Sequence, residues 1–112
     1  MQLIGKLDLG GLAYTACYAT PREVPALQGL DGYTDFATSR IYLDVALQAN
    51  PARAANKLAH ELVHGLLEDT GAARMLQSAM RCDDAAWSDM DENLARILAP
   101  AIAGLLESSV KL

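Results

Sequence analysis

The sequence lacks the features of membrane, repeat and nucleic-acid-binding proteins. No apolar run approaches the roughly 18 residues needed to cross a bilayer, and no repeat, low-complexity segment or linker interrupts the 112 residues. Lys and Arg number 9 against 14 Asp and Glu, which gives a formal charge of −5. Because phosphate affinity comes mainly from clustered cations, we expect no direct nucleic-acid binding. We also expect no membrane association, and one globular domain over residues 1–112.

Cysteine is scarce as well. Cys17 and Cys82 are far apart in the sequence and form no CxxC pair, which indicates reduced thiols and not a disulfide framework. The segment Leu9 to Ala19 is fairly apolar, but Asp8 at its start and the Gly10-Gly11 pair within it argue against a secretory signal. We therefore expect a cytoplasmic protein.

The first 45 residues have the pattern of strands. Residues 3, 5, 7 and 9 share one face of an expected strand, and a second alternation runs from Leu12 to Tyr18. Gly10-Gly11 between them predicts a hairpin, because glycine supplies the positive φ that a primed turn needs. The strand pattern returns from Tyr33 to Val45, with a turn at residues 37–39. These segments predict a small, mostly antiparallel sheet of three or four strands.

The second half has helical periodicity. Asn50 can cap a helix and Pro51 can take its first position, after which apolar residues recur at three- and four-residue spacing to Asp69. A short helix is expected over residues 72–80. A last helix should begin near Ser88 or Asp89, and residue 100, a proline, should kink or split it. The fold class is therefore α+β, with the sheet first and the helices after it.

The only two histidines of the chain, His60 and His64, lie in the middle of the expected helix 51–69. Their spacing places both imidazoles on one helix face, where they can reach one ion. Glu61 lies about 100° round the helix, where it can bond a zinc-bound water and act as its general base. This is the HExxH signature of metallopeptidases. The alternative is a surface histidine pair with a salt-bridging glutamate, which the apolar neighbours of this stretch disfavour.

A catalytic zinc site built on two histidines needs a third protein ligand. With no further histidine, the ligand must be a carboxylate or a thiolate. Spacing favours Glu92, because a ligand from another helix completes a tetrahedron better than Glu68, one turn beyond His64. Asp91 and Cys82 are the next candidates, and Glu92 would otherwise serve its helix by capping or ion pairing. The remaining candidates are Asp69, Asp83, Asp84, Asp89 and Glu107.

The chain resembles a compact zinc metallopeptidase of the ImmA/IrrE (gluzincin) type, the short kind often encoded in phages and prophages. The specific part of the resemblance is the run Leu58-Ala59-His60-Glu61-Leu62-Val63-His64. Supporting parts are Gly10-Gly11 with Tyr14, Gly32-Tyr33 leading to Ile41-Tyr42-Leu43-Asp44, and Asp91-Glu92 leading to Leu98-Ala99-Pro100.

The resemblance implies a minimal zincin-like fold with one Zn²⁺ per chain, held by His60, His64 and Glu92, and with Glu61 as the base. A peptide substrate would lie along an edge strand, which we expect within residues 33–44. A tyrosine of that segment, Tyr33 or Tyr42, would either hydrogen-bond an oxyanion or serve in packing.

The expected function is that of a zinc metalloendopeptidase, which hydrolyses a peptide bond in a protein partner by means of a zinc-bound water activated by Glu61. The main alternative is a metal-binding but catalytically silent interaction protein of phage or prophage origin. A third interpretation is an interaction domain with a chance histidine pair. Glu61 favours the first, because a purely structural zinc site needs no base at that position.

Overall fold

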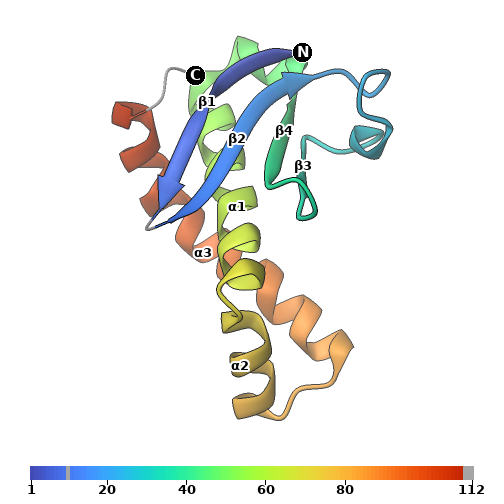
Figure 1. The fold of residues 1–112 in the computed structure, drawn as a ribbon, viewed down its shortest axis with the longest axis vertical. Coiled ribbons are helices and arrows are strands. Elements are labelled where there is room, and N and C mark those ends of the chain that lie inside the picture. The colour runs from blue at the N-terminus through green and yellow to red at the C-terminus, as the bar shows by residue number, and fades with distance from the viewer. Residues whose placement is uncertain (10, 110–112) are drawn as a thin grey trace.

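The computed structural model describes residues 1–9 and 11–109, without the side chains of residue 9 and residues 107–109. Gly10 of the expected turn and the side chain of Glu107 therefore lie outside the described part. The helices α1 and α3 cover one face of a four-stranded sheet, and α2 extends beyond the sheet (Figure 1). The elements in chain order are β1 (Gln2–Leu9), β2 (Leu12–Ala19), η1 (Pro25–Leu27), β3 (Gly32–Asp35), β4 (Arg40–Asp44), η2 (Val45–Ala49), α1 (Pro51–Asp69), α2 (Ala72–Met80) and α3 (Asp84–Ser109).

The first two strands form the expected hairpin. β1 and β2 pair antiparallel up to Leu9 opposite Leu12, and Gly11 has the positive φ of 92° that favours glycine. The simple alternation expected for β1 is wrong at its start, because the register shifts between Leu3 and Gly5. This irregularity lets Ile4 pack against the core while Leu3 is exposed.

The sheet is mixed, and the expectation of a mostly antiparallel sheet is corrected in this respect. The strand order is β1-β2-β4-β3, in which β2 and β4 pair parallel and β3 and β4 pair antiparallel. Residues 20–39, which include η1 and β3, form the connection between the two parallel strands β2 and β4. β4 takes the inner position because Ile41 and Leu43 are fully buried, whereas the Gly- and Thr-containing β3 is left at the edge.

Helix α1 has the limits expected from the sequence. The Asn50 side chain accepts a hydrogen bond from the Arg53 amide, Pro51 opens the helix, and the αL conformation of Gly71 follows its end. Its sheet-facing residues are small or aliphatic and fully buried. They include Ala55, Leu58, Ala59 and Leu62.

The last two helices differ from each other in how well the sequence predicts them. α2 spans the expected residues, but α3 begins earlier than Ser88 or Asp89 because the Asp83 side chain accepts a hydrogen bond from the Ala86 amide (2.8 Å). Pro100 does not split α3. It faces solvent, where water can bind the carbonyl that proline leaves unpaired. No described helix combines the length and the apolar character needed to cross a membrane.

Candidate metal centre

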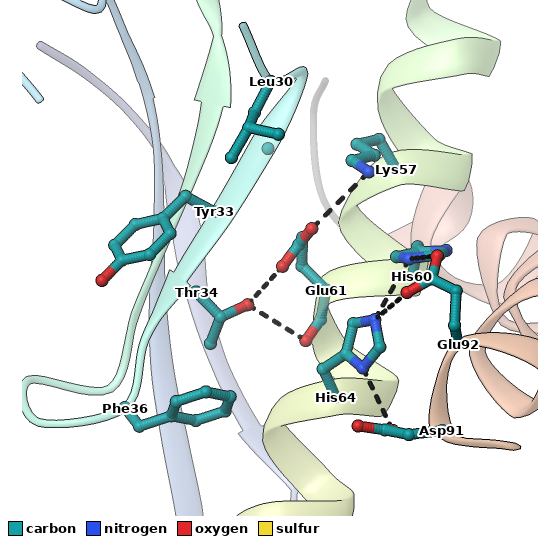
Figure 2. Close-up of a pocket in the computed structure, with 11 residues that line it drawn as sticks. Leu30, Tyr33, Thr34, Phe36, Lys57, His60, Glu61, His64, Asp91 and Glu92 are labelled. Carbon is teal, nitrogen blue, oxygen red and sulfur yellow. Dashed lines mark hydrogen bonds and ion pairs between the residues drawn. The ribbon is translucent and has the colours of Figure 1, made fainter. Parts of the chain in front are cut away.

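His60, His64 and Glu92 converge between α1 and α3 (Figure 2). The two imidazoles, one helical turn apart, bring their Nε2 atoms to 3.1 Å from each other. Glu92 of α3 places Oε1 3.0 Å from His60 Nε2 and Oε2 3.2 Å from His64 Nε2. Each residue offers a donor atom within 4.8 Å of the other two, so the three could hold a metal ion. We call them the His–Glu group.

Asp91 determines how His64 presents its second nitrogen. Its Oδ1 lies 3.1 Å from His64 Nδ1, so in the neutral ring the partner assigns the proton to Nδ1 and leaves a lone pair on Nε2. That lone pair faces a Glu92 oxygen at 3.2 Å. Two acceptors at this distance repel each other unless a proton or a metal cation lies between them. A carboxylate behind a ligating histidine is also the usual second partner of such a ring.

The donor separations suit a small metal ion. Zinc bonds to histidine nitrogen and carboxylate oxygen are about 2.0–2.2 Å, which puts neighbouring tetrahedral ligands about 3.3 Å apart. The observed separations of 3.0–3.2 Å are close to that value. The group supplies two imidazoles and one carboxylate from the part of the chain that the structure describes, so a tetrahedral ion held by it would keep a fourth position for water, as in catalytic zinc sites.

The electrostatics of His60 favour the form that binds metals. Burial lowers the pKa of His60, and the positive charge of Lys57 lowers it further, while the negative charge of Glu92 acts in the opposite direction. A lowered pKa keeps more of the imidazole neutral near pH 7. Neutral imidazole is the species that coordinates metal ions.

Glu61 lies beside the His–Glu group but is directed toward the sheet. Its residue is only 7% exposed, and Thr34 Oγ1 of β3 donates a 2.6 Å hydrogen bond to its Oε2. The second oxygen, Oε1, is 3.6 Å from Lys57 Nζ, one helical turn earlier on α1. Figure 2 shows the Glu61 carboxylate turned to Thr34 and Lys57, with the two imidazoles and Glu92 on the α3 side. A buried carboxylate thus has one hydroxyl donor and one cation.

Both parts of the site border one open cavity of about 450 Å³. We call this cavity the cleft. One wall is formed by α1 and α3, with Lys57, Glu61 and the His–Glu group. The opposite wall is formed by β3 and its flanking residues. The residues on that wall are Leu30, Gly32, Tyr33, Thr34 and Phe36.

None of the other candidate ligands with a described side chain belongs to the His–Glu group. Asp69 accepts a hydrogen bond from Tyr14, Asp83 caps α3, and Asp84 accepts one from Gln77. Cys82 lies between α2 and α3. Glu68 and Asp89 are exposed.

The two tyrosines weighed as oxyanion donors are placed differently. Figure 2 shows the Tyr33 side chain directed away from Glu61 and the histidines. Tyr42 is buried in a small cluster with Ala19 and Leu27, and does not line the cleft. Both tyrosines belong to that cluster's packing, with Tyr33 partly buried against it.

The sequence reasoning missed Thr34 and Lys57. Lys57 had a readable signal, because it precedes Glu61 by four residues and such pairs meet on a helix surface. Thr34 had none, because its contact with Glu61 depends on how the sheet packs against α1. Asp91, a candidate ligand by spacing, lies behind His64 with Oδ1 3.1 Å from Nδ1.

Comparisons with protein families, curated proteins and solved structures give no match for this chain. The resemblance to ImmA/IrrE-type peptidases therefore stays a prediction based on the motif residues.

Proposed function

We propose that the chain is a zinc-dependent metallopeptidase of the ImmA/IrrE type, which hydrolyses a peptide bond in a protein partner. One Zn²⁺ per chain would be held by His60, His64 and Glu92, with Glu61 as the general base. The observation that carries this proposal is the convergence of the three donor residues at 3.0–3.2 Å in a cleft that also contains Glu61.

Each residue would have a defined task. Zinc in this position would supply Lewis acidity toward a water and the scissile carbonyl. Glu61 would take the proton of the attacking water and deliver it to the leaving amine. Because Thr34 holds Oε2 at 2.6 Å while Lys57 lies 3.6 Å from Oε1, Oε1 is the oxygen available for this transfer. Asp91 would keep His64 in the Nδ1-protonated form and its Nε2 ready to bind.

The edge position of β3 suits a peptide substrate. Within the described sheet, β3 is the edge strand beside β4, so its other side presents backbone donors and acceptors along the cleft. An extended peptide can satisfy these groups as an added strand. That placement would lay a peptide bond between β3 and the His–Glu group.

The decisive test is Glu61→Gln, which keeps the shape of the side chain and removes its ability to accept a proton. We expect about one zinc per chain by elemental analysis in both wild type and variant, and loss of cleavage of a quenched-fluorescent peptide library in the variant only. Glu68→Gln, an exposed glutamate of the same helix, should behave as wild type. Wild type without zinc, or a Glu61→Gln variant that still cleaves, would disprove the proposal.

One observation favours a second candidate, a metal-binding interaction protein that does not cleave its partner. The Glu61 carboxylate already has a partner for each oxygen, Thr34 and Lys57. If these contacts hold when a partner binds, Glu61 is not free to act as a base. A wild type that binds one zinc and shows no hydrolysis in the same library assay would support this second function.

A further inference from the structure

Two large apolar side chains are exposed at the ends of β3. Leu30, just before the strand, is 51% exposed, and Phe36, just after it, is 47% exposed. A single exposed apolar residue needs no explanation, but both of these border the cleft that contains Glu61 and the His–Glu group. Exposed apolar side chains gathered at a concave site are typical of binding surfaces.

Between Leu30 and Phe36, the side of β3 that borders the cleft carries no large side chain, and the groups beside it are polar. Gly32 has no side chain, and a Cβ at its position would lie 3.1 Å from Lys57 Cε and 3.2 Å from Glu61 Cγ. Thr34 is small and its hydroxyl is bonded to Glu61. Gly32 and Thr34 alternate with Tyr33 and Asp35 along β3, and Figure 2 shows Leu30 and Phe36 near the two ends of this strand beside the cleft.

The charges around the cleft disfavour an acidic ligand. Three carboxylates line it, from Glu61, Asp91 and Glu92, against the one ammonium of Lys57. Lys57 is itself paired with Glu61. In the metal-free chain, an acidic side chain placed along β3 would therefore meet like charge, whereas an apolar side chain would bury surface against Leu30 or Phe36 with or without zinc.

We propose that the cleft binds an extended peptide segment that carries large apolar side chains and no acidic ones, and that Leu30 and Phe36 determine this specificity. The segment adds to the free edge of β3 and seats one apolar side chain against each of the two residues. This inference rests on the proposed function in one respect: if the chain is a peptidase, such a segment is its substrate. The binding itself requires no hydrolysis.

The test is NMR titration of the ¹⁵N-labelled full chain carrying Glu61→Gln, with and without zinc. The probes are three capped decapeptides that differ at two positions only, which are leucine, serine or aspartate. We expect the leucine peptide to shift the amide signals of β3 and to bind at least about tenfold more tightly than the serine peptide. The aspartate peptide should bind most weakly.

Matched variants test whether Leu30 and Phe36 determine the preference for apolar side chains. Leu30→Ser and Phe36→Ser should each weaken binding of the leucine peptide by about tenfold. Leu3→Ser is the control, because Leu3 is 57% exposed but lies on β1, the opposite edge of the sheet. Its variant should bind as strongly as the parent chain.

Several results would overturn the inference. These are equal affinity for the three peptides, no binding of any of them, or an equal loss in Leu3→Ser. Self-association of the chain that Leu30→Ser abolishes would show that a second copy occupies this surface. The proposed function fails separately. Absence of zinc in the wild type, with the leucine preference intact, would reject the peptidase and keep the binding site. Peptide cleavage by the wild type without that preference would reject the binding site and keep the peptidase.

Discussion

The two sides of helix α1 are built on opposite principles. The side that packs in the hydrophobic core consists of small and aliphatic residues such as Ala55, Leu58 and Leu62. The side toward the cleft carries His60 and Glu61 among its charged or polar groups, and their partners come from β3 and α3. One helix thus joins an apolar core to a polar cleft.

The comparison shows that the residues that stabilise the fold and the residues suited to chemistry lie on different sides of one helix. Burial of the apolar side removes surface from water and stabilises the fold. The polar side pays a desolvation cost that its partners offset only in part, and His64 Nε2 lies 3.2 Å from a Glu92 oxygen that must share a proton or a cation with it. Changes on the first side should therefore reduce stability, and changes on the second should reduce metal binding while leaving the fold intact.

Leu58→Ala should give the largest effect. Leu58 is fully buried between α1 and the sheet, so the cavity left by the change should lower the free energy of unfolding by about 2–5 kcal/mol. Urea unfolding with a chelator present measures this without any contribution from metal. Ile97→Ala, at an exposed position of α3, should change the free energy by less than about 0.5 kcal/mol. Similar losses in the two variants would contradict the assignment of the core.

Glu92→Gln should follow, with a loss of metal binding. Removing the one carboxylate of the His–Glu group should weaken zinc binding by roughly a hundredfold or more, measured by competition with a fluorescent zinc chelator. The stability of the metal-free chain should not fall, because the variant also removes an acceptor that faces His64. Glu68→Gln is the control, and equal zinc affinity in both variants would exclude Glu92 from the site.

Asp91→Asn should have a smaller effect on the same binding. The amide can still contact His64 Nδ1, but it no longer supplies a carboxylate that fixes the ring's tautomer and orientation. We expect zinc affinity to fall by about 10- to 100-fold, the usual cost of losing such a partner. Asp89→Asn, an exposed aspartate two residues earlier, should leave the affinity unchanged. A larger loss than in Glu92→Gln would make Asp91 the direct ligand.

Tyr14→Phe, a change in the core, should give the smallest effect, a small loss of stability. The buried Tyr14 hydroxyl donates to Asp69 Oδ2 (2.6 Å), and its loss should cost about 1 kcal/mol at pH 7. Burial, the hydrogen bond to Asp69 and the Asp69 charge raise the pKa of Tyr14. The unfolded chain therefore ionises first above about pH 10, and stability falls there as pH rises. Urea unfolding at pH 7 and pH 10.5 should show a smaller decline for the variant; equal declines would contradict this linkage.

The predicted fold is correct where local signals were sufficient. Asn50 and Pro51 mark the start of α1, and Gly11, with its positive φ, lies between the paired strands β1 and β2. The start of α3 was missed because Asp83, and not Ser88 or Asp89, caps it. The parallel pairing of β2 with β4 was missed because sequence alternation does not specify a strand's neighbour. That pairing depends on the path of residues 20–39, which include β3, and on the burial of β4.

The sequence alone determined the succession of strands and helices, and the placement of His60 and His64 on one helix face, because helical and strand periodicity involve only neighbouring residues. It favoured Glu92 over Asp91 and Cys82 without deciding between them. Only the tertiary structure brought Glu92 against both imidazoles, Asp91 behind His64, and Thr34 against Glu61. These contacts join residues about 27 to 32 positions apart, and their geometry follows from the packing of α1 against the sheet and α3, which no local pattern encodes.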